Sequence, residues 1–121
     1  MREIKFKGKR IDNGEWVYGS LFANKGKMFI LVPLLYMEGF GMESFEVDPS
    51  TVGQYTGHEN AYEGDIIRDE YGQFWEIFWD DIGHALRARC PTETVPLYWF
   101  DKTEFSDVVG NIHDNPELLE A

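Results

Sequence analysis

Cysteine is nearly absent from this sequence, which has one, Cys90, among 121 residues. A single cysteine cannot form a disulfide within the chain, so packing and hydrogen bonds must hold the fold together. Long hydrophobic runs are lacking too: the longest, residues 28–37, contains Pro33 and is about half of the roughly 20 residues that a membrane-spanning helix needs. The N-terminus does not resemble a signal peptide, because charges alternate with Ile4 and Phe6. We therefore expect a cytoplasmic protein with no membrane span.

Basic residues are also scarce. Against 11 Lys and Arg stand 22 Asp and Glu, which gives a formal net charge of −11. Such a surface repels the phosphate backbone of nucleic acids and the head groups of anionic lipids, so direct binding to either is not expected. Solubility alone accounts for the charge. A sharper interpretation is a decoy that presents carboxylates to a basic partner.

Motifs of catalysis are missing as well. The sequence has no glycine-rich phosphate loop with its lysine and no Gly-x-Ser-x-Gly elbow. Cys90 precedes Pro91 without a catalytic motif beside it, which predicts a buried, inert thiol. We expect a protein without enzymatic activity and without a cofactor.

Aromatic residues, in contrast, are plentiful at 16% of the chain, and they favour strands. The clearest pattern is a predicted β-hairpin, in which residues 62–68 and 74–79 flank a polar link that contains Gly72. In the second run, Trp75, Ile77 and Trp79 share one face. Both faces of this hairpin carry aromatic surface, so the rest of the chain or a second subunit must cover it.

Further alternating or apolar segments, separated by turn signals, predict additional strands. These segments are residues 2–6, 15–22, 28–35, 44–47, 51–56, 84–90 and 108–112, with a short helix as the alternative for residues 84–90. Residues 37–41 are expected to form a loop, and residues 97–100 a short aromatic run. Asn115 and Pro116 have the order of a helix cap and a first helical residue. We predict one domain over residues 1–121, all-β or mainly β, a small antiparallel barrel-like or meander sheet with a short C-terminal helix.

Several blocks, taken together, resemble the YopX family of phage and prophage proteins. The blocks are residues 51–57, residues 62–67 and residues 109–119, with residues 2–6 and 16–19 fitting the same pattern. The resemblance implies a mainly β fold, a phage or prophage origin and no assigned activity, and it supplies no catalytic residue. Family members often have a longer link before the Tyr-Glu-Gly-Asp block than this chain has.

Candidate chemical sites are weak. His58, His84 and His113 each lie beside acidic residues, but no two have the close spacing of metal ligands, so surface histidines are the favoured interpretation. Glu63 and Asp65 lie two residues apart and would point the same way on a strand. Such residues at the start of a hairpin are more often solvated or hydrogen-bonded to turn amides than used in acid–base catalysis.

The aromatic residues give the remaining signal. Five of them either fill the interior of a small barrel or anchor a protein interface. They are Trp75, Trp79, Tyr98, Trp99 and Phe100.

These features favour an uncharacterised, non-enzymatic accessory protein that forms a homo-oligomer and contacts host or phage proteins. An acidic decoy for a basic DNA-binding protein is the alternative hypothesis, and an enzyme with a cryptic site is the third.

Overall fold

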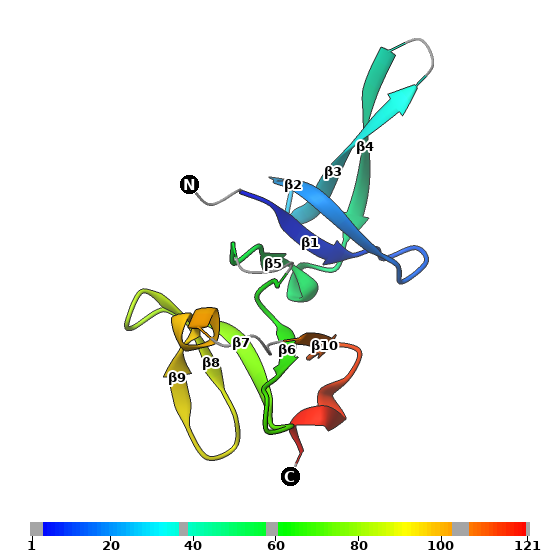
Figure 1. Ribbon diagram of the computed structural model, residues 1–121. Coiled ribbons are helices and arrows are strands. Elements are labelled where there is room, and N and C mark those ends of the chain that lie inside the picture. Colours follow the sequence, from blue (N-terminus) through cyan, green and yellow to red (C-terminus); the bar gives the residue numbers. More distant parts are fainter. Residues whose placement is uncertain (1–3, 37–38, 58–60, 103–106, 121) are drawn as a thin grey trace. The chain divides into compact units, whose positions relative to one another are not determined.

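The computed structural model describes residues 4–36, 39–57, 61–102 and 107–120. The chain divides into two compact units, residues 1–55 and residues 56–121, and each holds a five-stranded antiparallel sheet (Figure 1). The prediction of a mainly β fold is confirmed, whereas one domain over residues 1–121 stays a prediction. Within the described ranges, no helix is long and apolar enough to cross a membrane.

The first unit orders its strands β4-β3-β2-β1-β5. The strands are β1 (Phe6–Lys9), β2 (Trp16–Asn24), β3 (Lys27–Tyr36), β4 (Gly39–Val47) and β5 (Gly53–Gln54). Lys25 and Gly26 join β2 to β3 with φ values of 52° and 79°, as a tight hairpin turn requires. The loop predicted for residues 37–41 is corrected in part: residues 39–41 belong to β4, and residues 37–38 lie outside the described residues.

Strand β2 changes partner along its length, which curls this sheet. Its first part pairs with β1 through Gly19, and its second part pairs with β3 from Ser20 onward. A methyl group at Gly19 would overlap the carbonyl oxygen of Leu31, so only glycine permits the change. At the other end, Arg10 and Val47 form an antiparallel bridge that returns β4 to β1. This end of the sheet curves around the fully buried Ile30 and Val47.

The β3–β4 hairpin continues past the rest of the first sheet (Figure 1). Pairing of β3 with β2 stops at Leu31, but β3 and β4 stay paired as far as Tyr36 and Gly39. We call residues 32–36 and 39–43 the β3–β4 arm. Among the described residues, these two segments pair only with each other.

The second unit orders its strands β10-β6-β7-β8-β9. The strands are β6 (Asp65–Arg68), β7 (Phe74–Asp80), β8 (Ala85–Arg89), β9 (Thr94–Pro96) and β10 (Asp107–Asn111). The predicted hairpin is present as β6 and β7. One carboxylate organises its link: Asp69 accepts hydrogen bonds from the backbone N–H groups of Tyr71 and Gln73, both at 2.9 Å, and from the Trp75 indole at 2.9 Å.

The core of the second unit lies on one face of this sheet. Ile77 and Ala88 are fully buried there, and Trp75 meets Phe100 edge to face at a centroid separation of 5.6 Å. Phe100 comes from a 3-10 helix, η2 (Leu97–Lys102), which contains the predicted aromatic run. The alternation of β7 therefore marks the buried face correctly at Trp75 and Ile77, whereas Trp79, predicted on the same face, is exposed.

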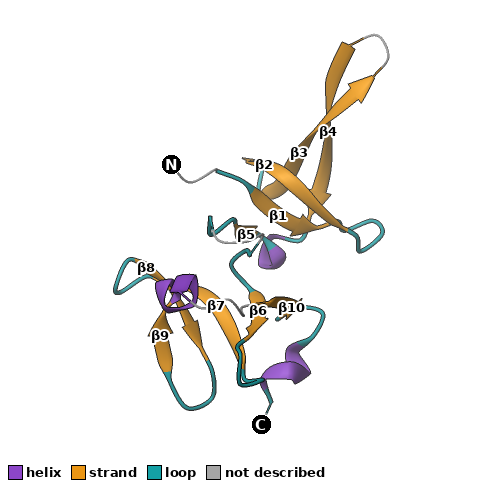
Figure 2. Ribbon diagram, viewed as in Figure 1, coloured by secondary structure: helices purple, strands orange, loops and turns teal. Residues whose placement is uncertain are grey.

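The short helices are all 3-10 turns (purple in Figure 2), and the predicted C-terminal helix is one of them, η3 (Pro116–Leu119). Pro116 does begin it, but Asn115 makes no side-chain cap bond. Its side chain instead accepts a hydrogen bond from the backbone N–H of Asn111 at 3.3 Å. The N–H groups of Leu118 and Glu120 bond three residues back, which defines a 3-10 rather than an α turn.

Candidate functional site

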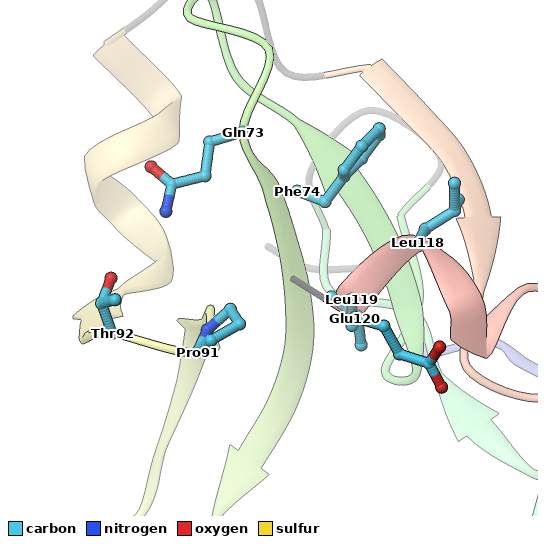
Figure 3. Close-up of a pocket in the computed structure, with 7 residues that line it drawn as sticks. All are labelled: Gln73, Phe74, Pro91, Thr92, Leu118, Leu119 and Glu120. Carbon is cyan, nitrogen blue, oxygen red and sulfur yellow. The ribbon is translucent and has the colours of Figure 1, made fainter.

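A groove opens on the second unit where η3 approaches β7 (Figure 3). Its first part is a cavity of about 260 Å³. The lining residues come from the start of β7, from the β8–β9 turn and from η3, and they are Gln73, Phe74, Pro91, Thr92, Leu118, Leu119 and Glu120. In Figure 3, Pro91 and Thr92 lie on one side of β7, and Leu118 and Leu119 lie on the other. The interior of the groove is thus mainly apolar.

A second cavity, of about 220 Å³, adjoins the first because the two share Pro91 and Leu119. Glu76, Arg89 and Cys90 complete its lining. We call the two cavities together the β7–η3 groove. Its second part is more polar than its first.

Local hydrogen bonds fix both walls of the groove. On one wall, the side-chain oxygen of Asn111 accepts the backbone N–H groups of His113 and Asp114, both at 2.9 Å, which turns the chain from β10 into η3. On the other wall, the N–H of Cys90 donates to the carbonyl of Glu93 at 2.9 Å and closes the β8–β9 turn. Each wall is therefore fixed by bonds within its own turn.

Cations at the groove are already engaged by carboxylates. Arg89 donates to both oxygens of Glu76, at 3.1 and 3.3 Å, and its guanidinium lies 4.1 Å from the ring centroid of Phe78. The other two arginines of this unit are also paired, Arg87 with Asp80 and Arg68 with Asp107.

The two units differ sharply in charge. Residues 1–55 contain seven Lys and Arg and seven Asp and Glu, whereas residues 56–121 contain four and fifteen. The whole excess of 11 negative charges therefore belongs to the second unit.

Cys90 is half-buried rather than buried, which corrects the sequence-based prediction. Its sulfur accepts a hydrogen bond from the Gln73 side chain at 3.0 Å and lies 3.4 Å from the Thr92 hydroxyl. Burial raises the pKa of the thiol, but hydrogen bonds from Thr92 and from the backbone of Glu93 outweigh it, so the pKa lies below its ordinary value. The inertness predicted for this thiol therefore does not follow from its surroundings.

Within the described part of the chain, the histidines do not form a site together. His84 lies in an exposed turn with φ of 52°, His113 follows β10, and His58 lies outside the described residues, with the short link predicted around it. Within the described ranges there is no group of three or more His, Cys, Asp or Glu side chains placed to hold a metal ion. The absence of a metal and of a cofactor stays a prediction.

Of the two carboxylates at the start of the hairpin, Asp65 begins β6 and bonds a turn amide, whereas Glu63 precedes the strand. Asp65 is 3% exposed and accepts a hydrogen bond from the backbone N–H of Tyr62 at 2.8 Å. This is the turn-amide bonding that the sequence favoured over acid–base chemistry. Glu63 lies in the same turn and is half-buried.

The five aromatic residues predicted as interface or core divide into two groups. Trp75 and Phe100 belong to the core, so their rings cannot meet a partner. Trp79, Tyr98 and Trp99 are 43%, 60% and 54% exposed. Contact of these three with a partner stays a prediction.

Sequence reasoning missed the groove itself. Phe74 begins the second predicted strand of the hairpin, but the sequence gave no signal that Pro91 and Leu119 would line the same groove. The apolar pair Leu118 and Leu119 after Pro116 was the one available hint, because an amphipathic turn needs a surface to cover.

These features describe a mainly β protein with two small antiparallel sheets and an apolar surface groove. A family model described as YopX protein matches residues 5–120. The chain therefore belongs to the YopX family, and the resemblance of its sequence blocks is confirmed. No curated protein matches the chain.

Proposed function

We propose that this YopX-family chain acts by contact with other proteins rather than by catalysis, and that it associates with copies of itself through the β3–β4 arm. The observation that carries the proposal is the hydrogen bonding of this arm. Residues 32–36 and 39–43 are paired with each other and, among the described residues, with no third strand.

A hairpin of this kind is incomplete in two ways. A two-stranded ribbon alone is only marginally stable in water, and its outer edges present unpaired backbone donors and acceptors. Its exposed residues include Pro33 and Met42, and Met42 is 52% exposed. Antiparallel pairing of two β4 strands around a two-fold axis would satisfy one such edge in each copy.

Exposed aromatic side chains on the second unit support a protein that works by contact. Trp79, Tyr98 and Trp99 combine large apolar area with a polar tip, which is the chemistry of interface anchors. Origin in a phage or prophage and action in the host cytoplasm form part of the same proposal, and they rest on the family resemblance alone.

The test compares two identical substitutions in one sheet. Ser44→Glu adds a carboxylate to the edge strand β4, directly after residue 43 of the arm. Ser20→Glu places the same charge on β2, on the other side of Leu31 from Ser44 and away from the β4 edge. Both serines are exposed. Light scattering should show an oligomer that Ser44→Glu dissociates and Ser20→Glu preserves, because like charges facing each other across paired strands are destabilising.

Since a two-fold interface contains each substitution twice, the dissociation constant for Ser44→Glu should rise at least roughly tenfold, which corresponds to about 1.4 kcal/mol. A wild-type mass equal to that of one chain at every concentration would contradict self-association. Equal effects of the two substitutions would place the contact elsewhere.

A second candidate function is the acidic decoy, and the charge of residues 56–121 is the observation that favours it. Fifteen acidic residues against four basic ones, with all three arginines paired, leave a strongly negative unit. Binding to a basic DNA-binding protein should then weaken steeply as salt rises. Binding that is insensitive to salt would exclude the decoy.

A further inference from the structure

We infer that the β7–η3 groove binds a basic peptide segment of another protein, which inserts an apolar side chain between Phe74 and Leu119. The inference deepens the proposed function, since it assumes action by protein contact, and it names the chemistry of the partner. It does not depend on the β3–β4 arm.

The size and lining of the groove indicate an apolar anchor. Phe74, Leu118 and Leu119 are half-buried, so they already form a surface that a further apolar group can complete. The first cavity measures about 260 Å³ and the adjoining one about 220 Å³, and both are open to the surface. One or two apolar side chains of a docked segment fit within either cavity.

The charge around the groove indicates a basic segment. Glu120 lines the groove, Glu117 is exposed on the same 3-10 turn, and Glu93 is exposed next to Thr92 on the opposite wall. Among the described residues that line the groove, Arg89 is the one cation, and Glu76 accepts two hydrogen bonds from it. Lys or Arg residues flanking the apolar anchor would therefore find carboxylates on both sides.

The same charge argues against a second copy of this unit as the occupant. Residues 56–121 carry 15 acidic and four basic residues, so two copies of this surface repel each other. A basic partner gains both the apolar contact and the attraction. A groove of this kind binds weakly and specifically, in the manner of short-motif recognition.

The experiment uses the intact protein and a fluorescent nine-residue peptide with a central Leu-Phe pair flanked by lysines. Fluorescence anisotropy measures its binding at low and moderate salt. Two control peptides replace Leu-Phe by Ser-Ser or replace the lysines by glutamates. We expect binding of the first peptide alone, because both the anchor and the charge are required.

Two charge reversals localise the site. Glu120→Lys changes the groove, and Asp81→Lys makes the same change at an exposed residue of the β7–β8 turn. Glu120→Lys should weaken peptide binding at least fivefold, while Asp81→Lys should change it less than twofold. Leu119→Ala, checked by circular dichroism, should weaken binding with the charge intact.

Several outcomes would overturn the inference. If Glu120→Lys and Asp81→Lys weakened peptide binding equally, the binding would be non-specific electrostatic attraction. If the Ser-Ser peptide bound as tightly as the Leu-Phe peptide, the apolar anchor would play no part. A change of oligomer mass caused by Glu120→Lys, without peptide binding, would identify the occupant as a second copy. The proposed self-association is tested separately from the groove. Ser44→Glu should change the oligomer mass, but it should not change peptide binding to the groove.

Discussion

Replacing Asp69 tests the claim that one carboxylate builds the central hairpin. It accepts two backbone N–H groups, from Tyr71 and Gln73, and the indole N–H of the buried Trp75, each at 2.9 Å. Hydrogen bonds to a charged group contribute about 1.5–3 kcal/mol each when buried, and water replaces them when they are exposed. The two backbone bonds are exposed and the indole bond is partly buried, so Asp69→Ala should lower the free energy of unfolding by about 2–4 kcal/mol.

The pKa of Asp69 also predicts how its contribution to stability changes with pH. Partial burial raises the pKa of Asp69, but hydrogen bonds from Trp75, Gln73 and Tyr71 outweigh it and lower the pKa below its ordinary value. A carboxyl group whose pKa is lower in the folded state stabilises the fold above its unfolded pKa of about 4. That contribution is lost as pH falls through the folded pKa. The difference in the free energy of unfolding between wild type and Asp69→Asn should therefore be largest at neutral pH and become smaller in acid.

Urea unfolding followed by circular dichroism measures these differences. Asp81→Ala serves as the control, because Asp81 is an exposed residue of the next turn and should change stability little. Values for Asp69→Ala and Asp69→Asn within about 0.5 kcal/mol of wild type, the range of ordinary surface substitutions, would refute the reasoning. A difference that did not shrink in acid would refute the role of the charge.

Three further predictions concern packing and reactivity. Gly19→Ala should lower the free energy of unfolding by more than about 3 kcal/mol, because its methyl group overlaps the Leu31 carbonyl oxygen. Gly26→Ala lies in open space with φ of 79° and should lower it by about 1 kcal/mol. Denaturant unfolding measures both values. Ile77→Ala removes a fully buried side chain and should lower the free energy of unfolding by about 2–5 kcal/mol in the same assay. Cys90, whose pKa is lowered, should react with iodoacetamide at lower pH than it does in the urea-unfolded chain, and an identical pH profile would contradict this.

Local patterns in the sequence were enough to predict the central hairpin. Residues 62–79 hold both strands and their link, so the alternation of Trp75 and Ile77 and the turn residue Gly72 act within one short segment. Residues 15–22 and 28–35, which turn signals separate in the same way, pair as the β2–β3 hairpin. The family blocks added the order of the segments but no site.

Features that depend on distant segments were not predictable. The loop assigned to residues 39–41 is strand because β3 pairs with it, and the glycines there gave the opposite local signal. The β7–η3 groove joins Phe74, Pro91 and Leu119 through the pairing of five strands, which no short window contains. The net negative charge lies in residues 56–121. This could be counted from the sequence only once the boundary between the units was known.

Hydrogen–deuterium exchange of the intact protein at low and high concentration tests self-association through the β3–β4 arm most directly. If copies pair along β4, peptides covering residues 39–45 should exchange more slowly at high concentration, while peptides covering the inner strand β6 should not change. Exchange in β4 that is independent of concentration, measured where light scattering detects an oligomer, would contradict the arm as the contact.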